Sequence, residues 1–357
     1  MFKRRETRVV KIGNVFVGSG HPVSIQSMLK TDTLDVASAV SKINRLADSG
    51  CEIVRVAVKD AAAAEAISSI KSGIGIPLVA DIHFDHKLAV LAARSGADKI
   101  RINPGNINGP DDVARVIDEC GSRGIPIRIG VNSGSIAQDA AGASVADMMV
   151  DSTLRYLEFF RKKKFNDIVI SLKASEVTDT VEAYRNISVQ CDYPLHLGVT
   201  AAGSMSTGMV KSAMGIGALL IDGIGDTIRV SLTGGPGDEI EAAKKILSAS
   251  GTRFFGPEVI SCPACGRCGV DLAYFAGRIE EELEKVCPAG TAFSRRFTVA
   301  VMGCEVNGPG EAGNADVGIA FGKNKGAIFR RGEIVRTVSA GEATDVLMDM
   351  IRKDLAR

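Results

Sequence analysis

Short apolar runs alternate with amphipathic stretches through the first two-thirds of the chain. The apolar runs have the length of strands and lie at Val23–Met28, Glu52–Val58, Pro77–Ile82, Lys99–Asn103, Pro126–Asn132, Asp167–Lys173, Pro194–Thr200 and Thr227–Leu232. The amphipathic stretches have helical periodicity and lie at Val36–Ser49, Ala61–Ser72, His86–Ser95, Asp111–Arg123, Met148–Lys163, Val177–Cys191, Thr207–Leu220 and Asp238–Ser250. Eight strand–helix units in about 250 residues predict a closed parallel (β/α)8 barrel of the TIM type. A doubly wound open sheet is less favoured, because no Gly-rich phosphate fingerprint follows the first strand.

The regular alternation of strand and helix patterns ends at about residue 250, which predicts a second domain. We interpret residues 1–250 as the barrel, 251–257 as a linker and 258–357 as a smaller α+β domain. Within the smaller domain, helices are predicted at Val270–Lys285 and Glu342–Leu355, and strands at Phe297–Met302, Asp316–Phe321, Ala327–Arg330 and Ile334–Val338.

Polar residues recur at every second position near the carboxyl ends of the predicted barrel strands. They are Arg55; Asp81 and His83; Arg101 and Asn103; Arg128 and Asn132; Ser171 and Lys173; His196 and Thr200; and Arg229 and Ser231. A period of two places alternate side chains on one face of a strand, here the inner face. The carboxyl ends of barrel strands converge at the catalytic opening, so these side chains are predicted to line it.

Five of these residues are cations, namely Arg55, Arg101, Arg128, Lys173 and Arg229. One such cation at a strand end is commonly a surface ion-pair partner, and His83 and His196 fit structural hydrogen bonding as well as proton transfer. Five cations in a confined opening repel one another unless an anion lies between them, and arginine pairs bidentately with phosphate. The pattern therefore favours a small substrate with two phosphate groups.

Composition and charge narrow the class of protein. The 357 residues carry a formal net charge of +1, which gives no general argument for nucleic-acid or membrane binding. No apolar run reaches the roughly 18 residues of a membrane span. The basic N-terminus is not followed by an apolar segment, so we expect a cytoplasmic protein rather than an exported one.

The eight cysteines fall into two groups. Cys51, Cys120, Cys191 and Cys287 are scattered singly, as buried apolar cysteines commonly are. The other four lie in Ser-Cys-Pro-Ala-Cys-Gly-Arg-Cys (261–268) and in Gly-Cys-Glu-Val-Asn-Gly-Pro-Gly-Glu (303–311). Clustered cysteines in a chain without an export signal indicate a metal or redox site rather than disulfides.

The cysteine spacing leaves two kinds of site open. Cys262, Cys265, Cys268 and Cys304 could bind a structural zinc ion, although zinc ribbons usually pair two Cys-x-x-Cys motifs. The same thiolates could instead hold an iron–sulfur cluster. The spacing does not match the Cys-x-x-x-Cys-x-x-Cys of a radical S-adenosylmethionine cluster.

Several longer motifs occur in one order along the chain. They are Val-Ala-Asp-Ile-His-Phe (79–84), Lys-Ile-Arg-Ile-Asn-Pro-Gly-Asn (99–106), Ile-Arg-Ile-Gly-Val-Asn (127–132), Leu-His-Leu-Gly-Val-Thr (195–200), Gly-Ile-Gly-Asp-Thr-Ile-Arg-Val-Ser-Leu (223–232) and the two cysteine motifs. From about residue 7 to residue 322, the chain resembles the 4-hydroxy-3-methylbut-2-enyl diphosphate synthase family in its two-domain bacterial form.

The resemblance implies a TIM-type barrel joined to an α+β iron–sulfur domain of the sulfite/nitrite reductase-like kind. It also implies reductive dehydration and ring opening of 2-C-methyl-D-erythritol 2,4-cyclodiphosphate in the non-mevalonate route to isoprenoids. Flavodoxin or ferredoxin would supply the electrons. Members of the family are homodimers in which one subunit's cluster domain caps the barrel of the other.

Residue by residue, the resemblance implies that Cys262, Cys265, Cys304 and Glu311 bind one [4Fe–4S] cluster, with Glu311 exchangeable. Substrate contacts are implied for Arg55, Arg101, Arg128, Lys173, Thr200, Arg229 and Ser231, and catalytic roles for Glu311, His83 and Asn132.

The chain departs from the family pattern at two positions. Ala201 stands where the family usually has a Glu, which removes a candidate proton donor for the dehydration. Cys268 stands where many relatives have another residue; it could replace Glu311 as a ligand or remain a free thiol, and we favour Glu311. The alternative functions are a phosphate-binding barrel of the pterin-synthase type with a zinc-stabilised tail, and an iron–sulfur sensor with reduced activity.

Overall fold

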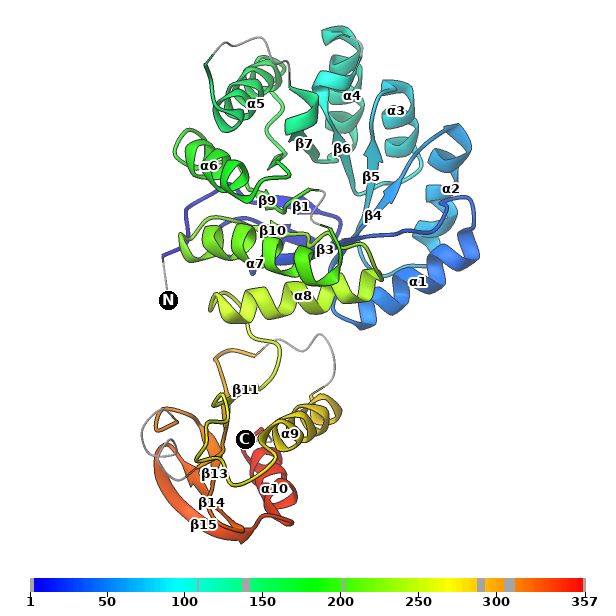
Figure 1. Cartoon of the computed structure of the whole chain (residues 1–357). Helices are drawn as coiled ribbons and strands as arrows, with labels where there is room; N and C mark the ends of the chain where they lie inside the picture. The colour runs from blue at the N-terminus through cyan, green and yellow to red at the C-terminus, as the bar shows by residue number, and fades with distance from the viewer. Residues whose placement is uncertain are drawn as a thin grey trace. The chain divides into compact units, whose positions relative to one another are not determined.

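The computed structural model describes residues 3–107, 109–136, 142–200, 203–287, 293–304 and 312–355. It divides into two compact units, residues 1–253 and residues 254–357 (Figure 1). No helix in the described ranges is both long enough and apolar enough to cross a membrane.

The first unit is a nearly closed parallel barrel, as the sequence predicted. Its eight-stranded sheet runs in the order β8-β7-β6-β5-β4-β3-β10-β9, and a parallel bridge between Ile170 and Leu195 joins the two ends. The strands are β3 (Ser24–Met28), β4 (Ile53–Ala57), β5 (Leu78–Ile82), β6 (Lys99–Ile102), β7 (Ile127–Asn132), β8 (Ile168–Lys173), β9 (His196–Leu197) and β10 (Thr227–Ile228).

Eight α-helices alternate with these strands and cover the outside of the barrel (Figure 1). They are α1 (Val36–Asp48), α2 (Ala61–Ser72), α3 (His86–Arg94), α4 (Pro110–Arg123), α5 (Val145–Lys162), α6 (Val177–Ser188), α7 (Met205–Ile221) and α8 (Pro236–Ala249). The carboxylates of Asp35, Asp60 and Asp85 accept from backbone amides of the first turns of α1, α2 and α3. These caps fix where each helix begins after its strand.

Two strands are shorter than the sequence predicted. The runs Pro194–Thr200 and Thr227–Leu232 form ladder structure only at β9 and β10, so the predicted extents were wrong. The Lys173 amine lies close to the Gly198 backbone, where an added Cβ would be 2.6 Å from it. The Leu232 amide donates to Glu239 at 3.2 Å instead of to a neighbouring strand. The Arg229 amide still donates to Leu197 at 3.0 Å, whereas at Leu232 the Glu239 side chain takes the place of a neighbouring strand.

The sequence analysis missed a hairpin at the start of the chain. β1 (Val10–Ile12) pairs antiparallel with β2 (Val15–Val17). Val10, Ile12 and Val17 pack in one buried cluster with Ile53, Val79 and Val169, which lie early in β4, β5 and β8. The hairpin thus covers the end of the barrel that is opposite the polar strand ends.

The second unit is a five-stranded sheet with two helices. Its strands run in the order β11 (Glu258–Ser261), β12 (Thr298–Met302), β13 (Val317–Phe321), β14 (Lys325–Arg330) and β15 (Glu333–Ser339). The first three are parallel and the last two antiparallel to their neighbours. β11 was not predicted.

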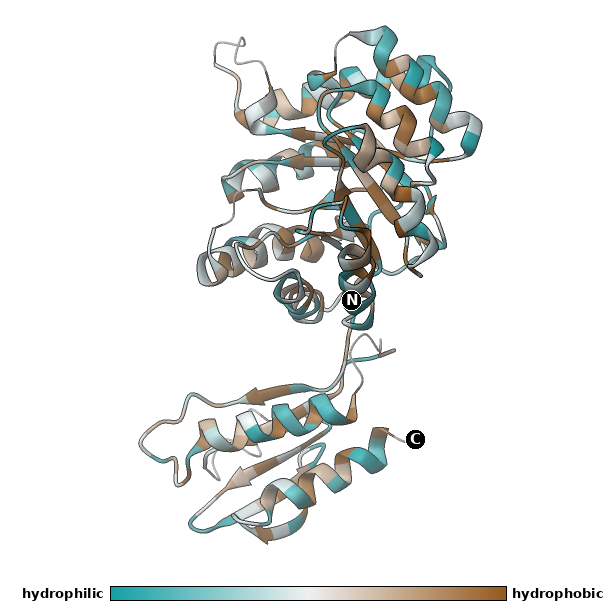
Figure 2. Cartoon of the chain, turned by 90° about the vertical axis from the view of Figure 1, so that its right-hand side faces the viewer, coloured by the Kyte–Doolittle hydropathy of each residue, from teal (hydrophilic) through white to brown (hydrophobic). Residues whose placement is uncertain are grey.

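Both helices of the second unit pack on one face of its sheet. Residues of α9 (Leu272–Val286) and α10 (Ala343–Leu355) share a core with Val299, Val317 and Ile319. Smaller side chains, among them Ala300 and Ala320, cluster on the other face. Figure 2 shows the hydrophobic colour concentrated on the strands of both units, while the helices carry both colours.

Candidate functional site

Strand register places the predicted cations next to one another inside the barrel. Asp81 on β5 pairs with Arg101 on β6, and Arg101 pairs with Arg128 on β7. On the next two strands, Asn132 pairs with Lys173. Paired positions in parallel strands present their side chains on the same face. We call this end of the barrel, where the strands terminate, the barrel mouth.

One buried carboxylate holds two of the arginines. Asp81 accepts a hydrogen bond from Arg101 Nη1 at 3.0 Å, and its other oxygen lies 3.7 Å from Arg55 Nε. Burial alone would raise the pKa of this carboxyl, but Arg55, His83 and the arginines of β6 and β7 lower it well below its usual range. Asp81 is therefore a fixed negative charge at the barrel mouth.

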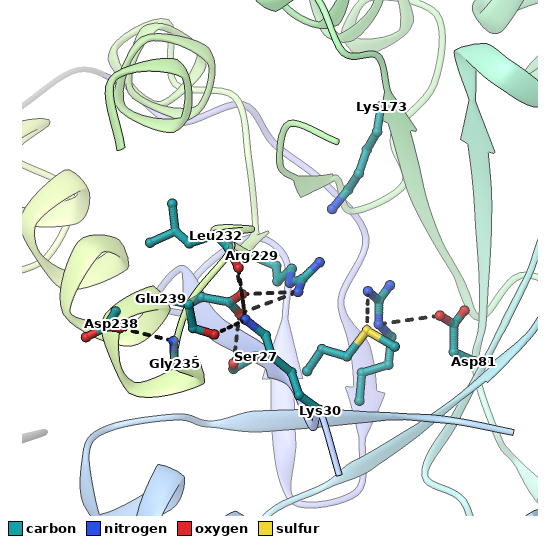
Figure 3. A network of polar contacts seen from close by, with 12 residues as sticks. Ser27, Lys30, Asp81, Lys173, Arg229, Leu232, Gly235, Asp238 and Glu239 are labelled. Atoms are coloured by element: carbon teal, nitrogen blue, oxygen red, sulfur yellow. Dashed lines mark hydrogen bonds and ion pairs between the residues drawn. The ribbon is translucent and has the colours of Figure 1, made fainter. Parts of the chain in front are cut away.

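A second carboxylate, which sequence reasoning missed, lies on α8. Glu239 is buried and lies 3.4 Å from Arg229 Nη2 and 3.1 Å from Lys30 Nζ. It also accepts from the Ser27 hydroxyl at 3.2 Å. Figure 3 shows Arg229 and Lys173 directed into the same region, with Glu239 and Asp81 on opposite sides of it. The only sequence signal was an acidic residue in the first helical turn after the Arg229 strand.

The charges inside the barrel do not balance. Six cations line the interior, which we call the interior cations: Arg55, Lys99, Arg101, Arg128, Lys173 and Arg229. Asp81 and Glu239 are the carboxylates that the described residues place beside them. Several donors also lack partners within the described part of the chain, including Arg128 Nε and Nη1 and Lys99 Nζ. Buried donors without partners are uncommon, and they suit an anionic ligand.

The interior cations depress one another's affinity for protons. Burial, together with Arg229 and Arg101, lowers the pKa of Arg55 to about 10. Burial and the neighbouring arginines also lower the pKa of Lys173 and of Arg128 well below their ordinary values. An anion entering this space would relieve the repulsion.

Two histidines occupy different environments. His196 is fully buried, with Nε2 at 3.4 Å from Lys173 Nζ and Nδ1 at 3.4 Å from the Thr227 hydroxyl. Burial and the nearby cations lower its pKa well below the ordinary value, so it is neutral. His83 is half exposed and lies 3.6 Å from Asp81. Only His83 therefore combines access from solvent with a carboxylate partner.

The remaining predicted residues surround this space. Asn132 ends β7 and Thr200 and Ser231 follow β9 and β10, all half-buried. The Thr200 amide donates to Ala174 at 3.2 Å, which ties its loop to the strand end of β8. Ala201 lies outside the described residues. His86 Nδ1 lies 3.1 Å from Asp112.

The four clustered cysteines lie on loops of the second unit. Cys262 follows β11 and Cys304 follows β12, and these strands are parallel neighbours. The Gly303 amide donates to Cys262 Sγ at 3.4 Å. A Cβ at Gly303 would be 2.4 Å from Cys268 Sγ, so only glycine fits between these thiols.

Cys265 and Cys304 approach a different group. Hydrogen bonds from the Arg267 backbone and guanidinium lower the pKa of the exposed Cys265 thiol, and the same guanidinium also contacts Cys304. Within the described ranges, no three His, Cys, Asp or Glu side chains meet closely enough to bind one metal ion. Glu311 lies outside the described residues. Thiolates on loops at neighbouring strand ends are the donor set that iron–sulfur clusters use.

Comparison with known proteins identifies the family. The family model described as "GcpE TIM-barrel domain" matches residues 7–244, and the family model described as "GcpE protein C-terminal domain" matches residues 258–353. The chain belongs to the GcpE family.

Characterised relatives cover nearly the whole chain. A protein of Fusobacterium nucleatum named 4-hydroxy-3-methylbut-2-en-1-yl diphosphate synthase (flavodoxin) is 49% identical over 354 residues, 98% of each chain. A protein of the same name from Nitratidesulfovibrio vulgaris is 51% identical over 342 residues, covering 95% of this chain and 87% of the relative.

Among solved structures, the barrel is similar to that of a Plasmodium falciparum HPPK-DHPS crystallised with pterin and p-hydroxybenzoate. The TM-score is 0.52 at 11% identity, over 68% of this chain and 48% of the other. This likeness shows the barrel fold alone.

Proposed function

We propose that this GcpE-family chain is a 4-hydroxy-3-methylbut-2-en-1-yl diphosphate synthase that reduces 2-C-methyl-D-erythritol 2,4-cyclodiphosphate with electrons from flavodoxin. The observation that carries the substrate class is the excess of interior cations, with buried donors that lack partners. The overall reaction takes up two electrons and two protons, opens the cyclic diphosphate and releases one water. It belongs to the non-mevalonate route to isoprenoids.

The barrel would hold the diphosphate at its mouth. Arg101 and Arg128, side by side on β6 and β7, offer guanidinium N–H groups suited to phosphoryl oxygens. Lys173 and Arg229 are directed into one region between Asp81 and Glu239 (Figure 3). Thr200 and Ser231 would supply hydroxyl groups at the rim. Asp81 and Glu239 fix the arginines before substrate arrives, so little reorganisation would be needed on binding.

The second unit would carry one [4Fe–4S] cluster on Cys262, Cys265, Cys304 and Glu311. When bound, the cluster supplies single electrons and a Lewis-acidic iron for the departing oxygen. The loops fit this role, because Gly303 brings the Cys262 loop and the β12 end together. Cys268 Sγ lies 3.2 Å from the Val270 carbonyl oxygen, and Glu311 rather than Cys268 would be the fourth ligand by the family resemblance. The fold of this unit would then be the sulfite/nitrite reductase-like iron–sulfur domain.

Proton handling would fall to residues at the mouth. His83 pairs with Asp81 at 3.6 Å and can receive protons from solvent, so it is the candidate donor to the leaving oxygen. Asn132, beside Lys173 in the register, would orient the substrate through its amide. Ala201 cannot donate a proton, which predicts a slower dehydration than in relatives with Glu at this position.

The active chain would be a cytoplasmic homodimer, with the cluster domain of one subunit completing the barrel site of the other. This assembly follows from the family resemblance, and it would bring electrons to a substrate held in a different unit. Size-exclusion chromatography with light scattering tests the dimer, and a mixed dimer of a barrel variant and a cluster variant tests the sharing. Recovery of activity in the mixed dimer is expected, and inactivity would contradict a shared site.

One experiment tests the function against its alternatives. Protein purified without air should be brown, contain about four irons per chain and turn over the cyclic diphosphate with reduced flavodoxin. A colourless protein with one zinc would favour the phosphate-binding barrel with a zinc-stabilised tail. A brown protein that binds the diphosphate without turnover would favour the sensor.

A further inference from the structure

Lys99 is an ionisable group that neither the sequence pattern nor the proposed site uses. It is fully buried, and its amine has no hydrogen-bond partner among the described residues. Lys99 begins β6 and shares its face with Arg101, two residues nearer the mouth. Its register partner is Val79, which belongs to the apolar layer on the hairpin. Val79 also pairs with Arg55 on β4, so Lys99 and Arg55 occupy one row of the inner face, and Asp81, Arg101 and Arg128 occupy the next row toward the mouth.

The groups around Lys99 are mostly cationic. The charged and titratable residues on the inner face of the barrel are Arg55, Asp81, Arg101, Arg128, Lys173, His196 and Arg229. Arg128 acts on Lys99 most strongly after burial, followed by Arg55. Asp81 contacts Arg55, Arg101 and His83. Glu239 contacts Lys30 and Arg229, and it accepts from the Ser27 hydroxyl and the Leu232 amide. Neither carboxylate neutralises Lys99.

Burial and the neighbouring arginines lower the pKa of Lys99 well below its ordinary value. In the absence of an anion these surroundings favour the neutral amine over the ammonium form. A phosphoryl group beside Lys99 would reverse this balance, because an adjacent negative charge favours the ammonium form. Arg128 Nε and Nη1, which also lack partners, offer donors to the same oxygen atoms.

We propose that Lys99 and Arg128 form an interior anion subsite below the barrel mouth, and that Lys99 takes up one proton from solvent when the cyclic diphosphate binds. The inference rests on the proposed function for the identity of the anion. One N–H bond forms in this step: the amine takes a proton from solvent or buffer and becomes an ammonium group that donates to a phosphoryl oxygen. Lys99 is thus a substrate-binding residue whose charge appears only in the complex.

Calorimetric titration of the full chain with 2-C-methyl-D-erythritol 2,4-cyclodiphosphate tests the proposal. In two buffers of different ionisation enthalpy near neutral pH, the wild type should take up at least one proton per ligand bound. Lys99→Met should take up about one proton fewer than the wild type and bind about tenfold more weakly. Lys245→Met, which removes an exposed lysine on α8, should match the wild type.

Thermal unfolding without ligand separates binding from a structural role. Lys99→Met removes a buried unpaired amine, so its melting temperature should equal or exceed that of the wild type. A lysine needed for packing or pairing would instead lower it on removal.

The outcomes also separate this inference from the proposed function. Ligand binding with no proton uptake, or with equal uptake in wild type and Lys99→Met, overturns the Lys99 subsite and leaves the proposed substrate intact. Uptake that is undiminished in the variant assigns the proton to Lys173 or His196 instead. A wild-type chain that does not bind the diphosphate at all overturns the proposed function and the inference with it.

Discussion

The two units build their functional residues in opposite ways. In the barrel, the interior cations project from strands whose register fixes them, and two carboxylates contact three of them: Asp81 contacts Arg55 and Arg101, and Glu239 contacts Arg229. In the second unit, the clustered cysteines lie on loops, with Cys262 and Cys268 beside Gly303 and with Cys265 and Cys304 beside Arg267. The barrel thus presents its cations from strands, whereas the second unit presents its thiols from loops.

This difference predicts which measurable property of the protein each ligand, the anion or the cluster, would change. An anion entering the barrel would relieve repulsion without moving the backbone, so its effect should appear as affinity and proton uptake. A cluster entering the second unit would order loops, so its effect should appear as stability of that unit. Four predictions test this contrast.

Loss of a cluster thiolate should have the largest effect. Cys304→Ser should lower the iron content of anaerobically purified protein below half of the wild-type value and reduce turnover by about a thousandfold or more. Binding of the diphosphate by calorimetry should change little, because the barrel has its own fixed contacts.

The matched control is Cys120→Ala, which removes a buried single cysteine on α4. It should keep iron and turnover near wild-type levels. Equal iron in Cys304→Ser and wild type would contradict the assignment of Cys304 as a ligand.

Removal of the Arg128 guanidinium should impair the barrel and not the second unit. Arg128→Met should weaken diphosphate binding by about a hundredfold, since charge-assisted hydrogen bonds to a phosphoryl group would be lost. Iron content should remain at the wild-type level. The control Arg94→Met removes an exposed arginine that pairs with Glu119 on the outer helices, and it should bind normally.

An acid at position 201, where the family usually has a Glu, should raise the turnover rate. Ala201→Glu should increase turnover by roughly tenfold with little change in affinity, because a carboxyl group would add general-acid catalysis. Steady-state kinetics under dithionite measure this. An unchanged rate would mean that position 201 does not supply the missing proton.

The smallest effect concerns pH. Because the pKa of Lys99 is lowered in the folded chain, the unfolded chain binds one more proton near neutral pH, and this costs stability. The cost shrinks as pH rises toward the ordinary pKa of lysine. As pH rises from 7 to 8, the stability advantage of Lys99→Met over wild type should therefore shrink, by at most about 1.4 kcal/mol per pH unit, as measured by urea denaturation without ligand. A pH-independent difference would show that Lys99 is already charged.

Much of the barrel could be predicted from the sequence. Buried strands such as β4 and β7 read as apolar runs, and a polar residue at every second position marked Arg55 and Arg128 as facing inward. The prediction failed where long-range contacts decide structure. β1 and β2 are too short to give a pattern, and they form because Val10 and Val17 find the apolar ends of distant strands.

The candidate site was less visible than the fold. Glu239 and Lys99 resemble ordinary helix and strand residues in the sequence, and their roles depend on burial against Arg229 and Arg128. The cysteine motif was visible in the sequence, but its spacing could not show which sulfur lies beside a backbone carbonyl and which accepts a hydrogen bond from a backbone amide. That distinction comes from the Val270 carbonyl and the Gly303 amide.

The first residues of the chain fasten the barrel's last strand. Arg4 Nη2 donates to Asp226 at 3.0 Å, and the Arg5 amide donates to Gly223 at 2.9 Å, so contacts more than two hundred residues apart complete the ring. During synthesis the barrel can therefore seal only once β10 has left the ribosome. The cysteine loops emerge later still, so we expect iron to be delivered after the barrel residues that are proposed to bind the diphosphate have been synthesised.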